Sequence, residues 1–133
     1  MKIAVLSDIH GNHFALNEVL LEAEKLKIDH LLVLGDLVGY YYHPDKVIEL
    51  LTNWSYDLIK GNHEEILLKI LNNVVPLDQI TKKYGRGHEL AIQKIPDSSM
   101  QVLCNLPEKK ELFIDGIKIL MTHGSPWSSD FYV

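Results

Sequence analysis

Four short polar blocks in this sequence each directly follow an apolar run and contain side chains that can bind a metal or transfer a proton. The blocks are Asp8-Ile9-His10, Gly35-Asp36, Gly61-Asn62-His63-Glu64 and Thr122-His123-Gly124. Taken singly, Asp36 would pass for a loop carboxylate, Asn62 for a helix cap and His123 for a core histidine. Together, their carboxylate, imidazole and amide groups match neither the all-oxygen cage of calcium nor a thiolate site. The mixture favours a divalent transition metal.

The apolar runs before the first three blocks are typical of buried parallel strands, at residues 3–6, 30–34 and 56–59. Helical spacing follows each strand: Asn12 can cap the first helix, Pro44 suits the first turn of the second, and residues 66–71 belong to the third. Ligands of open α/β sheets bind at the carboxyl ends of the strands. The sequence therefore predicts that the polar blocks meet at one sheet edge.

The second half of the chain has weaker signals until it reaches a hairpin. Within residues 72–110 we expect helices at about 87–95 and from Asp97 onward, and we find no chemical motif. Residues 111–114 and 118–121 then flank Asp115-Gly116, a dipeptide that favours a tight hairpin turn. The second strand of this hairpin is expected to deliver His123 to the other polar blocks.

In this order the blocks resemble the calcineurin-like metallophosphoesterase family, with its Asp-x-His, Gly-Asp, Gly-Asn-His-Glu and His-Gly motifs. The longer stretches at residues 7–12, 35–40 and 123–126 are similar to the small bacterial and archaeal phosphodiesterase branch. The resemblance covers residues 1 to 127 approximately. It implies an α/β fold, a metallophosphoesterase-type α/β/β/α sandwich that is incomplete at the C-terminus of this chain.

The same resemblance implies a site for two divalent metal ions. Asp36 would bridge the ions, Asp8 and His10 would complete one of them, and Asn62 and His123 would complete the other. Manganese is the first expectation, and iron, nickel, cobalt or zinc stay open. A hydroxide bridging the two metals would then hydrolyse a phosphodiester or a small nucleotide-like phosphate.

His63 is the expected catalytic residue and is not a metal ligand in the family pattern. By resemblance it would stabilise the phosphoryl charge or protonate the leaving oxygen.

The sequence departs from the family pattern in one respect. Family members end their active site with a Gly-His-x-His motif, whereas the Gly87-His88 pair here comes early and is followed by Glu89. We therefore expect residues 1–133 to form one truncated domain with three protein ligands for each metal and with open sheet edges through which a homo-oligomer could form. The alternative to an enzyme is a non-catalytic fragment, or a metal- or partner-binding chain that has lost hydrolase activity.

Composition limits the partners of this chain. A net charge of −5 with scattered basic residues argues against a broad nucleic-acid surface and leaves a small phosphorylated substrate as the expected ligand. The single cysteine, Cys104, excludes an internal disulfide. The apolar run after Lys2 is too short for a signal peptide, and no segment reaches a membrane span. These observations favour a cytoplasmic location.

Other conspicuous residues have open interpretations. His30, His43 and His88 are expected to be structural or solvated, and contact of His13 with substrate is the less favoured of its two interpretations. The run Tyr40-Tyr41-Tyr42 follows Asp36 closely. It could stack on a nucleobase or an aryl ester, or simply pack its own loop, and the sequence favours neither.

Overall fold

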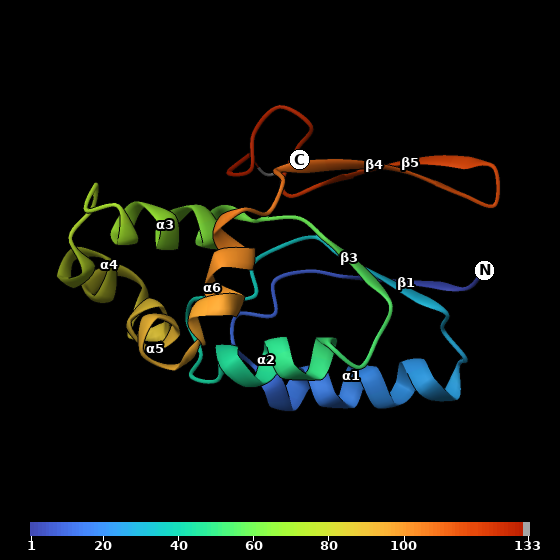
Figure 1. The fold of residues 1–133 in the computed structure, drawn as a ribbon, viewed down its shortest axis with the longest axis horizontal. Coiled ribbons are helices and arrows are strands. Elements are labelled where there is room, and N and C mark those ends of the chain that lie inside the picture. Colours follow the sequence, from blue (N-terminus) through green and yellow to red (C-terminus); the bar gives the residue numbers. More distant parts are fainter. Residues whose placement is uncertain (132–133) are drawn as a thin grey trace.

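The computed structural model describes residues 1–131 as two β-sheets with helices beside them (Figure 1). In chain order the elements are β1 Ile3–Leu6, α1 His13–Lys25, β2 His30–Val33, α2 Pro44–Leu51, β3 Tyr56–Leu58, α3 Asn62–Leu71, α4 Leu77–Tyr84, α5 Gly87–Lys94, α6 Asp97–Cys104, β4 Lys109–Ile114 and β5 Ile117–Thr122. The predicted helix starts are confirmed: Asn12 caps α1 through its side chain, and Pro44 begins α2.

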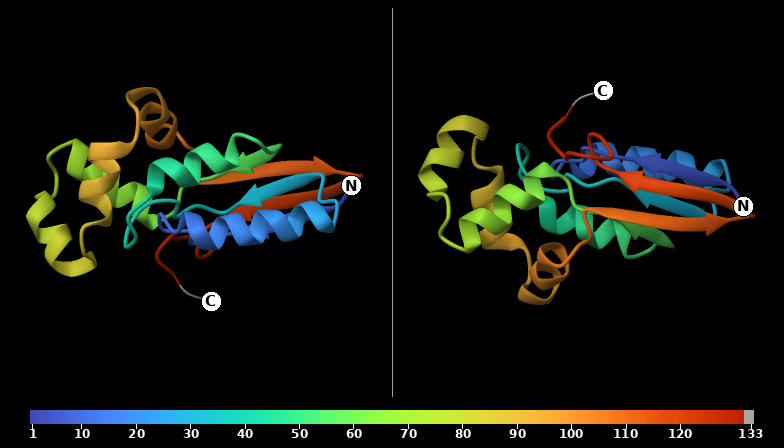
Figure 2. Two further views of the ribbon diagram at one scale, coloured as in Figure 1. Left: turned by 90° about the horizontal axis from the view of Figure 1, so that it is seen from below. Right: turned by 90° about the horizontal axis from the view of Figure 1, so that it is seen from above.

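The first sheet is parallel, in the order β1-β2-β3, and helices cover one of its faces. Leu31 and Val33 of β2 point into the larger core, where they pack with Leu16 of α1 and Val47 of α2. All four side chains are buried because the helices present apolar stripes at helical spacing. Figure 2 shows α1 and α2 lying along this side of the sheet.

The second sheet is the antiparallel hairpin β4-β5, which packs on the opposite face of the first sheet (Figure 2). Leu32 of β2, Ile59 and Met121 of β5 form a smaller core between the two sheets. The predicted Asp115-Gly116 turn joins the strands, and both of its residues have positive φ. The predicted α/β architecture is confirmed, and three layers of the sandwich are present: helices, parallel sheet and hairpin.

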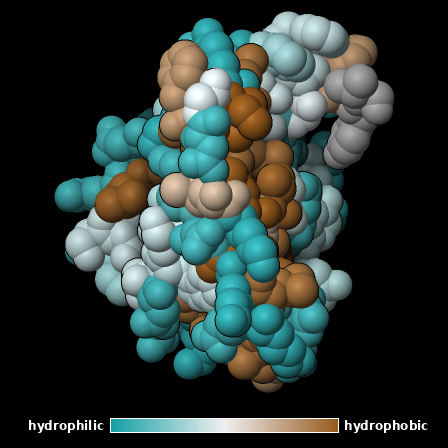
Figure 3. Space-filling view, turned by 90° about the vertical axis from the view of Figure 1, so that its right-hand side faces the viewer, coloured by the Kyte–Doolittle hydropathy of each residue, from teal (hydrophilic) through white to brown (hydrophobic). Residues whose placement is uncertain are grey.

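Hydrophobic side chains remain uncovered on the outer face of this hairpin and at the edge of the first sheet. Phe113 is 75% exposed and Val5 is 60% exposed, and within residues 1–131 no helix lies over the outer face of β4-β5 (Figure 1). Figure 3 shows hydrophobic side chains gathered in a band on the side of the molecule where the hairpin turn lies. Strand β1 is an outermost strand of the first sheet, and within residues 1–131 no further strand pairs with its other side.

Helix α4 was not expected from the sequence. Ile80 is the one buried side chain among its eight residues, and most of the others are polar or charged, so the segment is too short and too polar to stand out in the sequence. Together with α5 it forms a small helical group beside α3 (Figure 1).

None of the helices in residues 1–131 has the length and apolar character that a membrane span needs.

Candidate metal centre

Backbone hydrogen bonds extend the pairing of β1 and β2 into the loops that carry the first two polar blocks. The His10 N–H donates to the Asp36 carbonyl at 2.8 Å, and the Gly11 N–H donates to the Leu37 carbonyl at 2.7 Å. The two loops therefore run side by side beyond the ends of their strands. This pairing places the Asp-x-His and Gly-Asp motifs at the same edge of the sheet.

Three of the predicted ligand residues have left-handed backbone conformations. Asp8, His10 and Asp36 have φ values of 57°, 50° and 56°. For residues with a Cβ this region costs roughly 1 to 2 kcal/mol each. Strain of this kind concentrates where the fold must aim particular side chains, so these turns are consistent with a functional site.

Glu64 holds the two loops that surround Asp36. Its buried carboxylate accepts backbone N–H bonds from Asp36 at 2.7 Å, Leu37 at 2.8 Å, Val38 at 3.2 Å and Gly61 at 2.8 Å. The bond from Gly61 is also the reciprocal half of a capping box, because Glu64 is the third residue of α3. One side chain thus joins the loop after β2 to the start of α3.

Two glycines allow these segments to approach. A Cβ on Gly35 would overlap the backbone of Gly61, and a Cβ on Gly61 would overlap the Asp36 carboxylate. Gly35 also has a φ of +94°, which side chains disfavour. In the Gly-Asp and Gly-Asn-His-Glu motifs, a residue larger than glycine would therefore overlap the neighbouring segment of the site.

The structure brings all five predicted metal ligands together around Asp36. Asp36 Oδ2 lies 3.6 Å from His10 Nε2 and 3.5 Å from His123 Nε2. Asp8 Oδ1 lies 3.6 Å from His10 Nε2, and Asn62 Oδ1 lies 2.9 Å from His123 Nε2. Asp36 therefore occupies the middle position that a bridging ligand requires.

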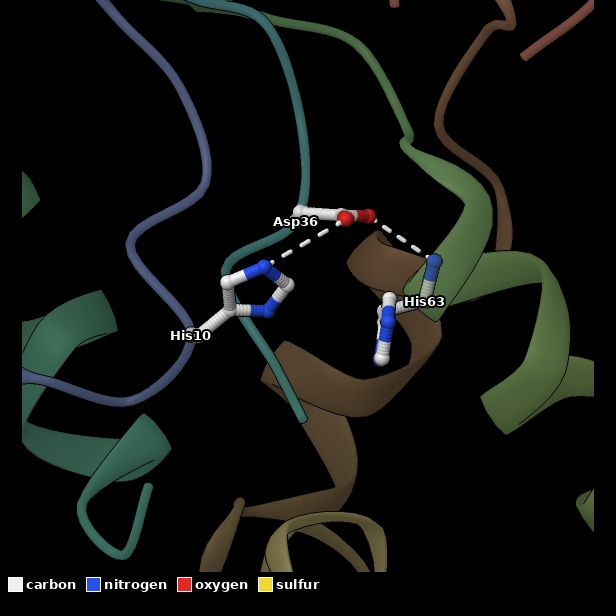
Figure 4. A group of neighbouring side chains, drawn as sticks. All are labelled: His10, Asp36 and His63. Carbon is white, nitrogen blue, oxygen red and sulfur yellow. Dashed lines mark hydrogen bonds and ion pairs between the residues drawn. The ribbon is translucent and has the colours of Figure 1, made fainter. Parts of the chain in front are cut away.

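The candidate ligand atoms form two groups that share Asp36. One group is His10, Asp36 and His63 (Figure 4), and the other is Asp8, Asp36 and His123; within each group the atoms lie within 4.8 Å of one another. His63, which the sequence assigned to catalysis rather than to metal binding, is thus close enough to reach the same centre.

The donor chemistry of the two histidines fits a cation. The Nδ1–H of His10 donates to the Val38 carbonyl at 2.8 Å, and that of His123 donates to the Leu34 carbonyl at 2.7 Å. A carbonyl can only accept, so in the neutral ring the Nε2 lone pair of each histidine points into the centre. The Nε2 of His123 then faces the side-chain amide of Asn62 at 2.9 Å, where a bound cation, or an amide turned so that its N–H donates, would satisfy the Nε2 lone pair.

Asp36 is 1% exposed, and its environment opposes its negative charge. Burial, followed by the charge of Glu64, raises the pKa of Asp36 to about 7. A bound cation would reverse this effect by stabilising the carboxylate. The centre is therefore electrostatically incomplete without positive charge.

We expect metal binding to release a proton from Asp36 at pH 6 but not at pH 8. Below its pKa of about 7 the carboxyl group is protonated in the metal-free protein and must ionise to bind, whereas above that pKa it has already ionised. Asp36 should contribute about 0.8 protons to the difference between the two pH values, and this part should be missing in Asp36→Asn. Calorimetric titration in two buffers of different ionisation enthalpy measures it; equal proton release at both pH values would contradict the assignment.

His63 lies under the centre in a cluster of rings. Its ring is 4.8 Å from that of His10, 4.9 Å from Tyr40 and 5.1 Å from Tyr84, and it stacks on His88 at 5.1 Å. Among the described residues its buried Nδ1 has no hydrogen-bond partner. Burial, then the charges of His10 and His88, lowers the pKa of His63 to about 3. The ring is therefore neutral near pH 7 and can offer a hydrogen bond to an incoming anion.

Residues 72–110, in which the sequence shows no chemical motif, form part of the surroundings of the site. Tyr84 of α4 and His88 of α5 both contact the His63 ring, and His88 is fully buried with its Nε2 3.3 Å from the His63 carbonyl. The signal available in the sequence was Gly87, where a Cβ would overlap the backbone of Tyr40. Of the two roles expected for His88, structural or solvated, the structure therefore shows the structural one.

The remaining histidines lie away from the centre. His30 pairs with Asp57 at 2.8 Å, and His43 is the N-cap residue of α2 without a side-chain capping bond. The ring of His13 lies 4.6 Å from that of His43 and lines a groove of about 510 Å³ between α1 and α2, which none of the predicted ligands borders. Tyr40 packs edge-on against His10, while Tyr41 and Tyr42 are exposed.

The profile of the calcineurin-like phosphoesterase family matches residues 1–132 of this chain. The chain therefore belongs to this family, whose members are metal-dependent phosphoesterases. The family resemblance and the fold class predicted from the sequence are both confirmed.

Particular relatives show how far the likeness extends. An uncharacterized protein from Methanocaldococcus jannaschii is 35% identical over 125 residues, which are 93% of this chain and 49% of that protein. A hypothetical protein from Pyrococcus horikoshii has the same fold, with a TM-score of 0.81 and 24% identity over 98% of this chain and 58% of its own. A metallophosphoesterase from Sphaerobacter thermophilus has a TM-score of 0.72 and 27% identity over 100% and 51% of the two chains.

A protein provisionally assigned as a diadenosine tetraphosphatase has a TM-score of 0.61 and 26% identity, covering 92% of this chain and 50% of its own. This chain thus spans about half the length of the relatives it matches.

Proposed function

We propose that this chain carries a dinuclear metal centre that hydrolyses phosphodiesters or small nucleotide-like phosphates. The observation that supports the proposal most directly is the shared position of Asp36 between two groups of candidate ligands. Asp8 and His10 would complete one ion, and Asn62 and His123 the other. Manganese suits this mixture of oxygen and imidazole ligands, as do iron, cobalt, nickel and zinc.

In the proposed reaction, the metal ions, Asp36 and His63 have different roles. Two divalent ions, when bound, supply positive charge for the phosphate and a nucleophile at neutral pH. Asp36 belongs to both groups of candidate ligands and would be the residue that holds both ions. His63, whose ring is neutral near pH 7, would donate a hydrogen bond from a ring N–H to the phosphoryl group. A phosphate anion beside this ring would raise the pKa of His63 and favour proton transfer to the leaving oxygen.

The proposal also includes a cytoplasmic location and self-association of the chain. A single cysteine suits a reducing cytoplasm. The exposed Val5 and Phe113 support self-association through the open edge of β1 and the outer face of the hairpin.

A calorimetric titration of manganese into metal-free protein, followed by hydrolysis of bis(p-nitrophenyl) phosphate, tests the proposal. We expect two sites per chain and turnover that needs the metal. One site or none, without turnover, would favour the alternative of a non-catalytic, metal- or partner-binding chain.

His63→Ala should lower turnover far more than metal affinity. Loss of a positioned proton donor costs about 100-fold or more in rate, while the five proposed ligands remain in place. The measurement compares kcat and manganese stoichiometry with those of the parent protein. His43→Ala is the matched control, because His43 makes no side-chain capping bond and lies outside the centre. A parallel fall of rate and metal content in His63→Ala would assign His63 to metal binding instead.

A further inference from the structure

A second cavity adjoins the candidate metal centre on the side of α4. The cavity at the centre itself, about 240 Å³, is lined by the proposed ligands Asp8, Asn62 and His123. The adjoining cavity is larger, about 440 Å³, and lies between α3 and α4. Asn62 and Asp130 border both cavities, so a molecule bound at the centre can extend from one into the other.

Two lysines bring positive charge to the adjoining cavity. Lys69 comes from the last turn of α3 and Lys83 from the last turn of α4. The ammonium group of Lys83 lies 4.8 Å from the centroid of the Tyr84 ring, an arrangement that favours a cation at this position. Gln79 adds a side chain that can donate or accept a hydrogen bond.

Two carboxylates also border this cavity, and their placement leaves the lysines available. Both oxygens of Glu65 lie 3.3 Å from the hydroxyl of Ser129, which donates to them. Asp130 borders the cavity of the metal centre as well, where cations would offset its charge. Neither carboxylate forms an ion pair with Lys69 or Lys83 within the described residues.

The wall that carries Lys83 is attached firmly to the centre. The Tyr84 ring contacts the rings of His63 at 5.1 Å and Tyr40 at 5.8 Å, and Ile80 anchors α4 in the interior. Lys83 is the neighbour of Tyr84 in the chain, so the packing of Tyr84 fixes the backbone from which the exposed Lys83 side chain extends. A cation held at a set distance from the reacting phosphate can select a substrate by where that substrate carries its next charge.

We propose that the cavity between α3 and α4 is a subsite for a second phosphate group of the substrate, with Lys83 and Lys69 as its cations. The inference rests on the proposed function, and it narrows the substrate class to nucleotides or polyphosphates with at least one phosphate beyond the group bound at the metal centre. A substrate whose ester group carries no charge would form no ionic contact with Lys83 or Lys69.

Binding of AMP and ADP to the manganese-loaded protein tests the subsite, because the two nucleotides differ by a single phosphate. Calorimetry at constant free manganese gives both dissociation constants. In the parent protein ADP should bind more tightly than AMP, and Lys83→Gln should reduce that preference by at least about 10-fold, the lower end of the usual worth of one hydrogen bond to a charged group. Lys69→Gln should act in the same direction, and AMP binding should change little in either variant.

Lys82→Gln is the matched control. Lys82 precedes Lys83 in α4 but pairs with Asp78 at 3.7 Å on the solvent side. This variant should keep the full preference for ADP. Equal affinity of the parent for AMP and ADP, or equal effects of Lys83→Gln and Lys82→Gln, would overturn the subsite and leave the phosphoesterase proposal standing. Failure of the parent to bind either nucleotide would also overturn the subsite, whereas the phosphoesterase proposal falls only if manganese binding and hydrolysis of bis(p-nitrophenyl) phosphate are absent.

Discussion

Asp36→Asn should abolish manganese-dependent hydrolysis and leave the fold intact. The amide keeps the shape of the side chain. Its oxygen can still accept the hydrogen bond that the backbone N–H of His63 donates to Asp36 Oδ1 at 2.8 Å. It carries no charge, however, and the shared ligand of both candidate groups would be lost. We expect turnover to fall by at least about 1,000-fold, in line with the several kcal/mol that metal ions contribute to phosphoryl chemistry.

The stability of the metal-free Asp36→Asn protein separates a functional role from a structural one. The pKa of Asp36 is raised in the folded state to about 7, from its usual 3.8, so the folded state holds its proton more strongly than the unfolded state does. Stability of the parent should therefore fall as pH rises from about 4 to 7 and stay low above that. The Asp36→Asn variant has no such ionisation, so at pH 8 it should be more stable than the parent by about 2 to 4 kcal/mol. At pH 4 the two proteins should have nearly the same stability.

Urea denaturation of both metal-free proteins at the two pH values measures this difference. Asp78→Asn serves as the control, because that carboxylate is exposed on α4 and pairs only with Lys82 among the described residues. A large loss of stability in Asp36→Asn at pH 8 would show that the carboxylate supports the fold and would contradict its placement as a charge held for a metal.

The sequence predicted the positions of the metal-centre residues because two strong local signals agree there. Apolar runs identify the strands, and the polar blocks directly after them must lie at the carboxyl ends of a parallel sheet. Asp8, Asp36 and Asn62 follow successive strands of one sheet, so their convergence needs only that the strands lie side by side. His123 needed the hairpin as well, and Asp115-Gly116 marks its turn clearly.

The surroundings of the centre were harder to predict, for identifiable reasons. Helix α4 has eight residues, most of them polar or charged, so it did not stand out in the sequence, and the positions of Lys83 and Tyr84 beside the centre could not be predicted. The burial of His88 under His63 depends on a close approach that only Gly87 permits. Such contacts depend on tertiary packing, which a reading of local pattern does not contain.

Glu64 shows the same limit within a motif that was identified. The block Gly61-Asn62-His63-Glu64 drew attention to its metal and proton chemistry, and nothing in the spacing indicates that the last residue accepts bonds from the backbone of a distant loop. That role appears only when the loop after β2 lies against the start of α3. A motif can therefore combine residues that react with residues that hold the reacting ones in place.

Glu64→Ala should be the most destabilising substitution near the centre. It would leave four backbone N–H groups without their acceptor, those of Asp36, Leu37, Val38 and Gly61. At about 1 to 3 kcal/mol for each unsatisfied buried donor, reduced by entry of water into the space left by the side chain, the loss of stability should be about 4 to 6 kcal/mol. Many domains of this size would unfold under that loss, so the experiment needs a milder variant as well.

Glu64→Gln provides that variant, because one amide oxygen can keep part of the bonding while the amide nitrogen faces N–H groups that it cannot accept from. It should lose about half as much stability and bind manganese more weakly, since the loop that carries Asp36 is no longer held. Glu65→Gln is the neighbouring control: its carboxylate accepts only from Ser129 among the described residues. Urea denaturation and manganese titration of the three variants decide the matter, because equal stabilities of Glu64→Gln and Glu65→Gln would mean that the four backbone bonds do not hold the centre together.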